Sequence, residues 1–331
     1  MPDLETVKLG ATGLEVGRLC LGTMIFGGPT VDEPGSLAVL DAAEELGLDF
    51  LDVADVYPVP PGPETWGRSE EIVGRWLRGA TGRRERWVVA TKFAARVGPG
   101  ANHAGGSRKH VIEACEASLR RLGIERIDLY WMHSPDLSTP LEETLEALDR
   151  LVQAGKILYA GASNYEAWRL ALSLALAAER RTVRFVAAQP PMSLIDRRAE
   201  RELLPLCRAA GIAFVPYNPL AAGMLTGKYR RGEDPPAESR FSLGDYGRSY
   251  QGRYWSGPAF DVVEKVVAIS AREGMSPPQV ALAWLLGREG MTAPIVGASR
   301  PEQLRDDLGA LGKRLSPEAV AELEEASAPF A

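Results

Sequence analysis

The stretch Leu51-Asp52-Val53-Ala54-Asp55-Val56-Tyr57 decides the fold, because it ends a mainly apolar run with a carboxylate and a phenol. Two later strand-like runs also end in reactive side chains: residues 87–92 end in Lys92, and residues 127–133 end in His133. Reactive residues at the carboxyl ends of consecutive strands are typical of a barrel enzyme, which assembles its site from distant parts of the chain.

The rest of the chain alternates in the same way. Apolar runs separated by helical patterns predict strands centred on 18–21, 48–52, 88–92, 127–133, 157–160, 185–189, 212–217 and 293–296. Strands with continuous apolar cores that alternate with helices indicate a parallel sheet covered by helices. An open doubly wound sheet is the alternative, but no Gly-x-Gly-x-x-Gly follows the first strand. We therefore expect one α/β domain over residues 1–331, a (β/α)8 TIM barrel with an N-terminal β-hairpin at residues 7–16 and extra helices.

Local signals predict particular boundaries. A helix that carries Val111, Cys115 and Leu119 on one face should end at Gly123. A capping box at residues 139–142 should begin the next helix, and Ser276 should begin another. About 75 residues separate the seventh and eighth strands, which is longer than usual for a barrel, so residues 221–257 are expected to form a long loop over the active face.

Composition excludes several classes of function. The net charge is −6 and no basic block is present, so we expect no nucleic-acid partner. The longest apolar stretch, at residues 170–178, is far shorter than the ~18 residues that a membrane span needs. Residues 1–5 are acidic and lack an apolar export segment, and Cys20, Cys115 and Cys207 are widely spaced. These features predict a cytoplasmic protein with reduced thiols and no membrane contact, and they leave oligomerisation open.

The four reactive residues fit carbonyl reduction, which needs a hydride donor, a proton source and a group that polarises the oxygen. Tyr57 suits the proton role if its pKa falls from ~10 toward neutrality, and a nearby Lys92 ammonium would lower it. Asp52 would keep Lys92 charged, and His133 could orient the substrate oxygen or share the proton. Taken singly, Asp52 could be a cap and Tyr57 a loop aromatic. His133 and Asp136 lack a third ligand, so no metal is expected.

Six segments carry a resemblance to a known family: LDVADVY (51–57), ASLRRL (117–122), DLY (128–130), HSPD (133–136), GASNY (161–165) and PIVGAS (294–299). Together and in this order, they resemble the aldo-keto reductase family, of the bacterial type and similar also to potassium-channel β-subunits. The resemblance covers nearly the whole chain. It implies a (β/α)8 barrel that binds NADPH/NADP+ extended across its carboxyl face, with Asp52, Tyr57, Lys92 and His133 as the catalytic residues.

The resemblance also assigns cofactor contacts. Residues 22–24 would lie beside the nicotinamide, residues 163, 164 and 189 would bind its carboxamide, and Tyr217 would stack on its ring. Residues 218–228 would follow the pyrophosphate, Arg240 would close over it, and residues 297–307 would bind the phosphate and adenine of the adenosine. The full set is Gly22, Thr23, Met24, Asp52, Ser163, Asn164, Gln189, Tyr217, Asn218, Pro219, Leu220, Gly223, Lys228, Arg240, Gly297, Ser299, Arg300, Gln303 and Asp307.

Without the resemblance, several of these residues have simpler interpretations. Gly223 could be a turn residue, Lys228 and Arg240 could be solvated charges, and Gln189 could satisfy a backbone group. Asp307 stands where an Asn is usual, and the loop at residues 58–66 is longer than in many members, which should reshape the substrate entrance. Candidate substrate-pocket residues, which could equally be core, are Phe26, Trp66, Phe93 and Trp131.

The sequence therefore predicts an NADPH-dependent oxidoreductase that reduces an aldehyde or ketone to an alcohol, with hydride from the nicotinamide and a proton from Tyr57. A nucleotide-binding regulatory subunit of the potassium-channel β-subunit type is one alternative. A nucleotide-sugar keto-reductase is another. The substrate is a small carbonyl compound whose identity depends on loops, and the sequence does not name it.

Overall fold

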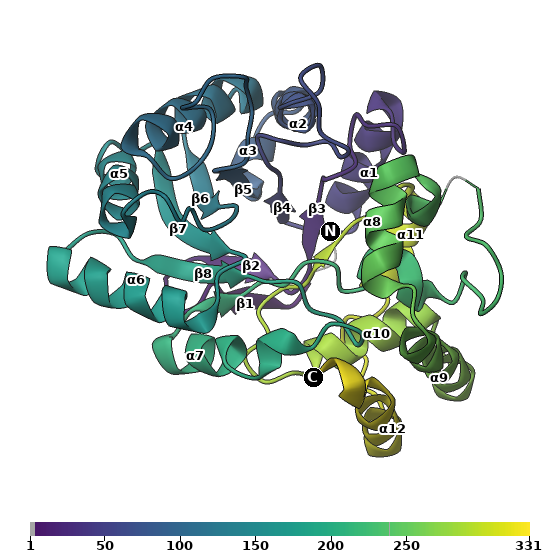
Figure 1. Cartoon of the computed structure of the whole chain (residues 1–331). Helices are drawn as coiled ribbons and strands as arrows, with labels where there is room; N and C mark the ends of the chain where they lie inside the picture. The colour runs from purple at the N-terminus through teal and green to yellow at the C-terminus, as the bar shows by residue number, and fades with distance from the viewer. Residues whose placement is uncertain (1–3, 238) are drawn as a thin grey trace.

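The computed structural model describes residues 4–237 and 239–331. The first three residues, on which part of the expectation about export rests, lie outside the described residues. Eight parallel strands form one sheet in the order β10-β3-β4-β5-β6-β7-β8-β9 (Figure 1). Their bounds are β3 (Cys20–Gly22), β4 (Phe50–Asp52), β5 (Val88–Phe93), β6 (Ile127–Met132), β7 (Ile157–Ser163), β8 (Phe185–Gln189), β9 (Ala213–Phe214) and β10 (Ile295–Val296). Each overlaps one of the predicted strands, although β9 and β10 are shorter than expected.

The sheet closes on itself through the segments that hold its two outer strands. The Thr292 N–H donates to the Phe214 carbonyl oxygen at 3.0 Å, and the Ile295 N–H donates to the Pro216 carbonyl oxygen at 2.8 Å. These bonds join the β9 and β10 segments, so the predicted barrel is confirmed. The predicted hairpin is also present, because β1 (Thr6–Lys8) pairs antiparallel with β2 (Glu15–Gly17).

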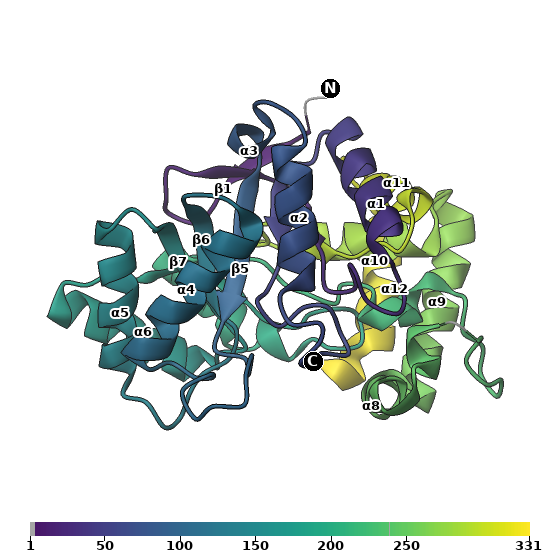
Figure 2. The ribbon, with the colours of Figure 1, turned by 90° about the horizontal axis from the view of Figure 1, so that it is seen from above.

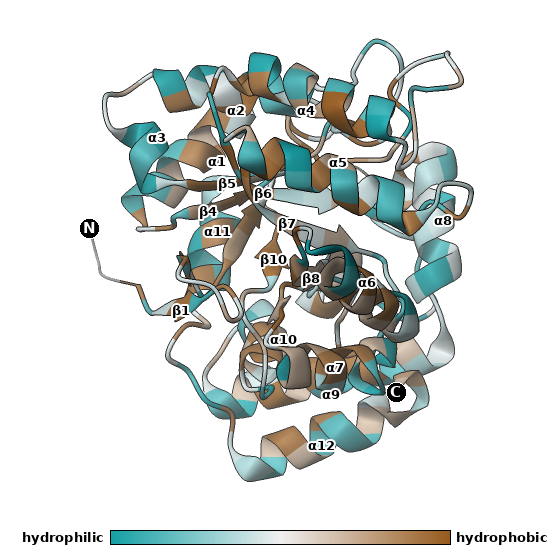
Figure 3. Cartoon of the chain, turned by 90° about the vertical axis from the view of Figure 1, so that its left-hand side faces the viewer, coloured by the Kyte–Doolittle hydropathy of each residue, from teal (hydrophilic) through white to brown (hydrophobic). Residues whose placement is uncertain are grey.

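Most of the helices surround the sheet on its outer side, and α8 lies over the carboxyl face of the barrel (Figures 1 and 2). They are α1 (Glu33–Glu45), α2 (Arg68–Arg78), α3 (Arg83–Arg86), α4 (Arg108–Leu122), α5 (Leu141–Gln153), α6 (Ala167–Arg180), α7 (Leu203–Ala210), α8 (Gly244–Tyr254), α9 (Gly257–Glu273), α10 (Pro277–Leu286), α11 (Pro301–Leu308) and α12 (Pro317–Ser327). Hydropathy follows this layering, since the strands and the inward faces of many helices are the more hydrophobic parts in Figure 3.

Two of the three predicted helix boundaries are confirmed. Gly123 follows α4 with a φ of 64°, which a glycine adopts without strain. Ser276 and Gln279 form the reciprocal capping box at the start of α10. The box predicted at residues 139–142 is wrong, because the Thr139 hydroxyl donates instead to the Asp136 carboxylate at 2.6 Å. Helix α5 consequently begins after Pro140 without a side-chain cap.

Strand alternation determines which side chains enter the barrel. Successive residues of a strand point to opposite faces of a sheet. Phe50 and Ala90 belong to the apolar cluster inside the barrel, whereas their neighbours Leu51 and Val89 pack outward against the helices. Residues two positions further along, Asp52 and Lys92, therefore point inward at the carboxyl end. This alternation explains how two charged side chains meet above an apolar barrel core.

Candidate active site

Helix α8 is part of the cover over the carboxyl face of the barrel, where the sequence predicted only a loop. The interval from 221 to 257 also contains the short 3-10 helices η2 (Ala221–Thr226) and η3 (Arg240–Ser242). The loop prediction is therefore wrong over these residues. Gly247, Tyr250 and Tyr254 are the buried residues of α8, so it lacks the aliphatic stripe by which a helix is normally recognised.

Lys92 connects the reactive residues that the sequence predicted. Its side chain is fully buried, forms an ion pair with Asp52, and donates to the Val53 carbonyl oxygen at 2.8 Å. The Lys92 Nζ also lies 3.3 Å from the Tyr57 hydroxyl oxygen. The second carboxylate oxygen of Asp52 accepts from Gln189 Nε2 at 2.9 Å. The ammonium is thus paired and hydrogen-bonded, which offsets the cost of removing it from water.

The protonation of Tyr57 differs from the sequence-based expectation. Burial raises the pKa of Tyr57 well above its usual value, and the negative charge of Asp52 acts in the same direction. The fall toward neutrality, on which the expected proton role was made to depend, is therefore not seen. Lys92 does lie in contact with Tyr57, but Asp52 neutralises its positive charge. Tyr57 consequently keeps its proton at neutral pH.

His133 lies beside Tyr57 and is neutral. The two rings meet edge to face with centroids 5.8 Å apart. Burial, followed by the positive charge of Lys92, lowers the pKa of His133 to about 3. Its main chain is fixed by two bonds, because its N–H donates to the Phe93 carbonyl at 2.9 Å and its carbonyl accepts from Asn164 Nδ2 at 2.8 Å. An uncharged imidazole therefore faces the same space as the Tyr57 phenol.

A cavity of about 740 Å³ opens above these residues. Its lining includes Asp52, Tyr57 and His133, whereas Lys92 lies beneath it and reaches it through its contacts with Asp52 and Tyr57. Every residue that the resemblance assigned to the cofactor lines this cavity except Thr23. The Thr23 side chain is instead fully buried, where its hydroxyl accepts a hydrogen bond from Ser69 Oγ at 2.9 Å. Thr23 thus joins β3 to α2 and does not contact the cavity.

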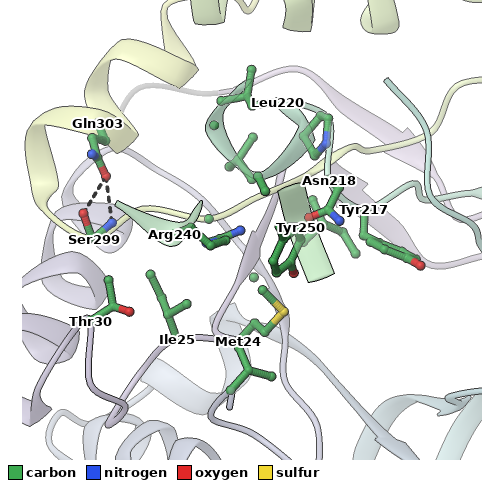
Figure 4. A pocket seen from close by; sticks show the side chains of 18 of the residues that line it. Met24, Ile25, Thr30, Tyr217, Asn218, Leu220, Arg240, Tyr250, Ser299 and Gln303 are labelled. Atoms are coloured by element: carbon green, nitrogen blue, oxygen red, sulfur yellow. Dashed lines mark hydrogen bonds between the residues drawn. The ribbon is translucent and has the colours of Figure 1, made fainter. Parts of the chain in front are cut away.

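Amide and hydroxyl groups line the middle of the cavity. Ser163 Oγ donates to the Gln189 carbonyl oxygen at 2.9 Å. The Tyr217 hydroxyl donates to Asn164 Oδ1 at 2.8 Å, and this bond fixes the phenol ring at the edge of the cavity, where Figure 4 shows it. The arrangement presents a flat aromatic ring beside several amide donors and acceptors.

Cations gather toward the other end. Lys228, Arg240 and Arg300 all line the cavity. Burial lowers the pKa of Lys228, and the positive charges of Arg240 and Arg300 lower it further, so the three side chains repel one another. A Cβ added at Gly223 would lie 3.1 Å from Lys228 Nζ, so the glycine leaves room for this side chain. A cluster of cations of this kind is suited to bind a polyanion.

The start of α11 completes this end of the cavity. Gln303 Oε1 accepts from the Ser299 N–H at 2.8 Å and from the Ser299 hydroxyl at 3.0 Å (Figure 4). Asp307 is almost fully buried, and burial, together with the charge of Asp306, raises the pKa of Asp307 to about 8. At pH 7 this carboxyl group is therefore mostly neutral, like the amide of the Asn that is usual at this position.

The predicted substrate-pocket residues are placed differently. Phe26, Phe93 and Trp131 are fully buried in the core, and Trp66 is half-buried outside the cavity lining. The prediction is wrong for Phe93 because it follows Lys92 on β5 and points outward, against Tyr130. Trp131 points inward and fills the barrel below the site. The apolar and aromatic lining that was not predicted comes from Ile25, Val59, Tyr246 and Tyr250. The spacing of Tyr246 and Tyr250 could have indicated one helical face, had α8 been recognised.

Comparisons with known proteins identify the family of the chain. A family model for the aldo/keto reductase family matches residues 18–328. The uncharacterized oxidoreductase YrpG of Bacillus subtilis (strain 168) is 36% identical over 97% of this chain and 95% of its own length. A probable voltage-gated potassium channel subunit beta of Oryza sativa subsp. japonica is 34% identical, over 97% and 96%. The L-glyceraldehyde 3-phosphate reductase of Escherichia coli O157:H7 is 33% identical, over 96% and 90%.

The chain therefore belongs to the aldo/keto reductase family, and its relatives include oxidoreductases. Across the described residues, the helices are too short or too polar to pass through a bilayer. The same part of the chain holds no group of three or more His, Cys, Asp or Glu side chains arranged to bind a metal ion.

The lowered pKa of His133 predicts an acid-sensitive stability. Between pH 6.5 and 3 the unfolded chain binds a proton at this residue and the folded chain does not, so unfolding becomes easier as the pH falls. We expect His133→Asn to reduce the loss of unfolding free energy between pH 7.5 and pH 5 by about 2 kcal/mol. Urea unfolding at the two pH values measures this loss. His103→Asn, at an exposed histidine, is the control and should behave as the parent protein does. An equal pH dependence in the parent and in His133→Asn would contradict the assignment.

Proposed function

We propose that this protein is an NADPH-dependent reductase of aldehydes or ketones in which Tyr57 donates the proton. The observation that carries the proposal is the chain of contacts from Asp52 through Lys92 to Tyr57, with the Lys92 Nζ 3.3 Å from the Tyr57 hydroxyl oxygen. An ion pair with only a structural role would not require that Lys92 also contact a tyrosine that lines the cavity. Family membership and the oxidoreductase relatives support the same reaction class.

The cavity lining fits a dinucleotide. Tyr217 offers a ring on which a nicotinamide can stack, and Ser163, Asn164 and Gln189 offer partners for its carboxamide. Lys228, Arg240 and Arg300 would hold the phosphates. Lys228, Arg240 and Arg300 line the same cavity and repel one another, and this gathering of positive charge favours the extra phosphate of NADPH over NADH. When bound, the reduced nicotinamide supplies the hydride.

The residues of the chain supply the rest of the chemistry. Tyr57, held protonated by burial, gives its proton to the carbonyl oxygen as negative charge develops there. The Lys92 ammonium, in contact with the Tyr57 oxygen, stabilises the phenolate that remains. The neutral imidazole of His133 can donate a hydrogen bond to the same carbonyl oxygen and orient it. The proton donor and the hydrogen-bond donor are thus both uncharged before the reaction.

A regulatory role of the potassium-channel β-subunit type is the second candidate, because relatives with that printed name are similar over nearly the whole chain. It does not require catalysis. The buried contacts of Lys92 with both Asp52 and Tyr57 favour the reductase, because they place a cation beside a phenol that lines the cavity, and nucleotide binding alone does not require that arrangement. Stoichiometric capture of a channel subunit without carbonyl turnover would favour the regulatory role instead.

Removal of the Tyr57 hydroxyl tests the proton donor. We expect Tyr57→Phe to lower kcat for carbonyl reduction about 10²- to 10⁴-fold, the range usual for loss of a general acid. The dissociation constant for NADPH, measured by fluorescence titration, should stay within about twofold because the cations that hold the phosphates are unchanged. Tyr159→Phe, on β7 and outside the cavity lining, is the matched control and should keep full turnover. Full turnover in Tyr57→Phe would remove the proposed donor.

The raised pKa of Asp307 predicts pH-dependent cofactor binding. Below pH 8 its carboxyl group is neutral, and above pH 8 it becomes an anion beside the proposed adenine site. We expect the dissociation constant for NADPH to rise by up to about tenfold between pH 7 and pH 9. The phosphates of NADPH are already ionised over this range.

Asp307→Asn should remove most of this rise while binding NADPH normally at pH 7. Lys228, whose pKa is lowered, remains in both proteins, so the comparison isolates Asp307. Fluorescence titration at the two pH values gives the result. A dissociation constant that rises equally in the parent and in Asp307→Asn would show that another group is responsible.

A further inference from the structure

One face of helix α8 runs along the cavity. Tyr246, Ser249, Tyr250 and Arg253 all line it. Residues spaced by three or four positions share one side of a helix, and seven positions span about 10 Å along its axis. The face therefore carries two phenols followed by a guanidinium, and it places them at successive points along the opening.

The neighbours of these residues order them along the cavity. The Arg240 guanidinium lies 5.8 Å from the Tyr250 ring centroid, and the Tyr246 and Tyr250 hydroxyl oxygens are 3.0 Å apart. Figure 4 shows Ser299 and Gln303 on one side, Arg240 and Tyr250 in the middle, and Tyr217 on the other side. Tyr250 is also among the groups close enough to raise the pKa of Tyr57. The middle of α8 thus faces the catalytic phenol.

Arg253 follows Tyr250 by three positions and lies near the C-terminal end of α8. Its guanidinium is 5.9 Å from the Tyr254 ring centroid, and its charge opposes the rise that burial causes in the pKa of Tyr217. The side chains whose charges raise the pKa of Arg253 are the phenols of Tyr254, Tyr217 and Tyr250, and no carboxylate is among them. Arg253 is therefore near Tyr217, which itself lies close enough to Tyr57 to be affected by its charge.

Among the described residues, the carboxylate of Asp196 lies in this region and is already paired. The negative charge of Asp196 contributes to the raised pKa values of Tyr217 and Tyr254. Its carboxylate accepts two hydrogen bonds of 2.9 Å from Arg198. Within residues 4–237 and 239–331, Arg253 forms no ion pair. It lines the cavity with Lys228, Arg240 and Arg300, but it is not among the charges that lower the pKa of Lys228. If Lys228, Arg240 and Arg300 hold the cofactor phosphates, Arg253 remains available near Tyr217.

We propose that Arg253 binds an anionic group of the substrate, so that the preferred substrate is a small carbonyl compound that carries a carboxylate or a phosphate. The proposal rests on the reductase function proposed above and names its substrate class. A guanidinium can bind either anion through two parallel hydrogen bonds, and its charge also attracts the substrate to the opening. Tyr57 and Arg253 line the same cavity, so one molecule can present its carbonyl to the first and its anion to the second.

Matched pairs of substrates test this specificity. Succinic semialdehyde is compared with butanal, and glyceraldehyde 3-phosphate with glyceraldehyde, each with NADPH. For every pair, the ratio of kcat/KM for the anionic compound to that for the neutral compound is measured. We expect Arg253→Gln to lower this ratio about 10- to 100-fold, mainly through KM, as for the loss of a charge-assisted hydrogen bond. Arg253→Lys should recover part of the loss, because the charge stays and the paired donors do not.

Arg198→Gln is the control, since Arg198 is an exposed arginine of the same region that pairs with Asp196 and lies outside the cavity lining. Its ratios should match those of the parent protein. A loss confined to one pair identifies the anion as carboxylate or as phosphate. Unchanged ratios in Arg253→Gln, or an equal fall in Arg198→Gln, would overturn the proposal.

A binding measurement separates this proposal from the reductase function. Glutarate, an unreactive dicarboxylate, is titrated against the protein with NADP+ present. We expect its dissociation constant to rise about 10-fold or more in Arg253→Gln and to stay unchanged in Arg198→Gln. If no carbonyl compound is reduced but glutarate shows this difference, the reductase function fails and the anion site stands. If aldehydes are reduced and glutarate shows no difference, only the anion site fails.

Discussion

The buried ion pair between Lys92 and Asp52 is the interaction on which the site depends. An ammonium with no solvent exposure is costly unless its charge and its donors are all compensated, and here Asp52, the Val53 carbonyl and the Tyr57 hydroxyl share that role. The barrel makes the pair possible because β4 and β5 are neighbouring parallel strands. Their register brings the inward-facing side chains of Asp52 and Lys92 together. Removing either partner alone would leave a buried charge, so the pair constrains both strands.

The same burial sets the charge of the surrounding groups. Tyr57 stays protonated and His133 stays neutral because a water-poor environment penalises their charged forms. The catalytic part of the cavity is therefore neutral apart from one compensated pair, whereas Lys228, Arg240, Arg253 and Arg300 line other parts of it. This division suits a reaction in which negative charge appears briefly on a carbonyl oxygen while permanent anions are held elsewhere.

Much of this arrangement could be predicted from the sequence, because it follows from local periodicity. The strands, the hairpin and the position of Lys92 at a carboxyl end required only alternation and apolar runs. Other features depend on tertiary contacts that periodicity does not encode. The direction of the pKa shift of Tyr57 depends on burial, the outward orientation of Phe93 depends on its register in β5, and Thr139 finds a partner in Asp136. Helix α8, with Arg253, was missed because its cavity-facing residues are polar and aromatic.

The most direct test of the central claim is the rate of single-turnover reduction of butanal by the NADPH complex when both charges of the pair are removed together. The double variant Lys92→Met with Asp52→Asn leaves no unpaired buried charge, so the barrel should remain folded. The account predicts a fall in this rate of about 10²-fold or more, with NADPH binding retained, because nothing then stabilises the Tyr57 phenolate. A single-turnover rate equal to that of the parent protein would contradict the account.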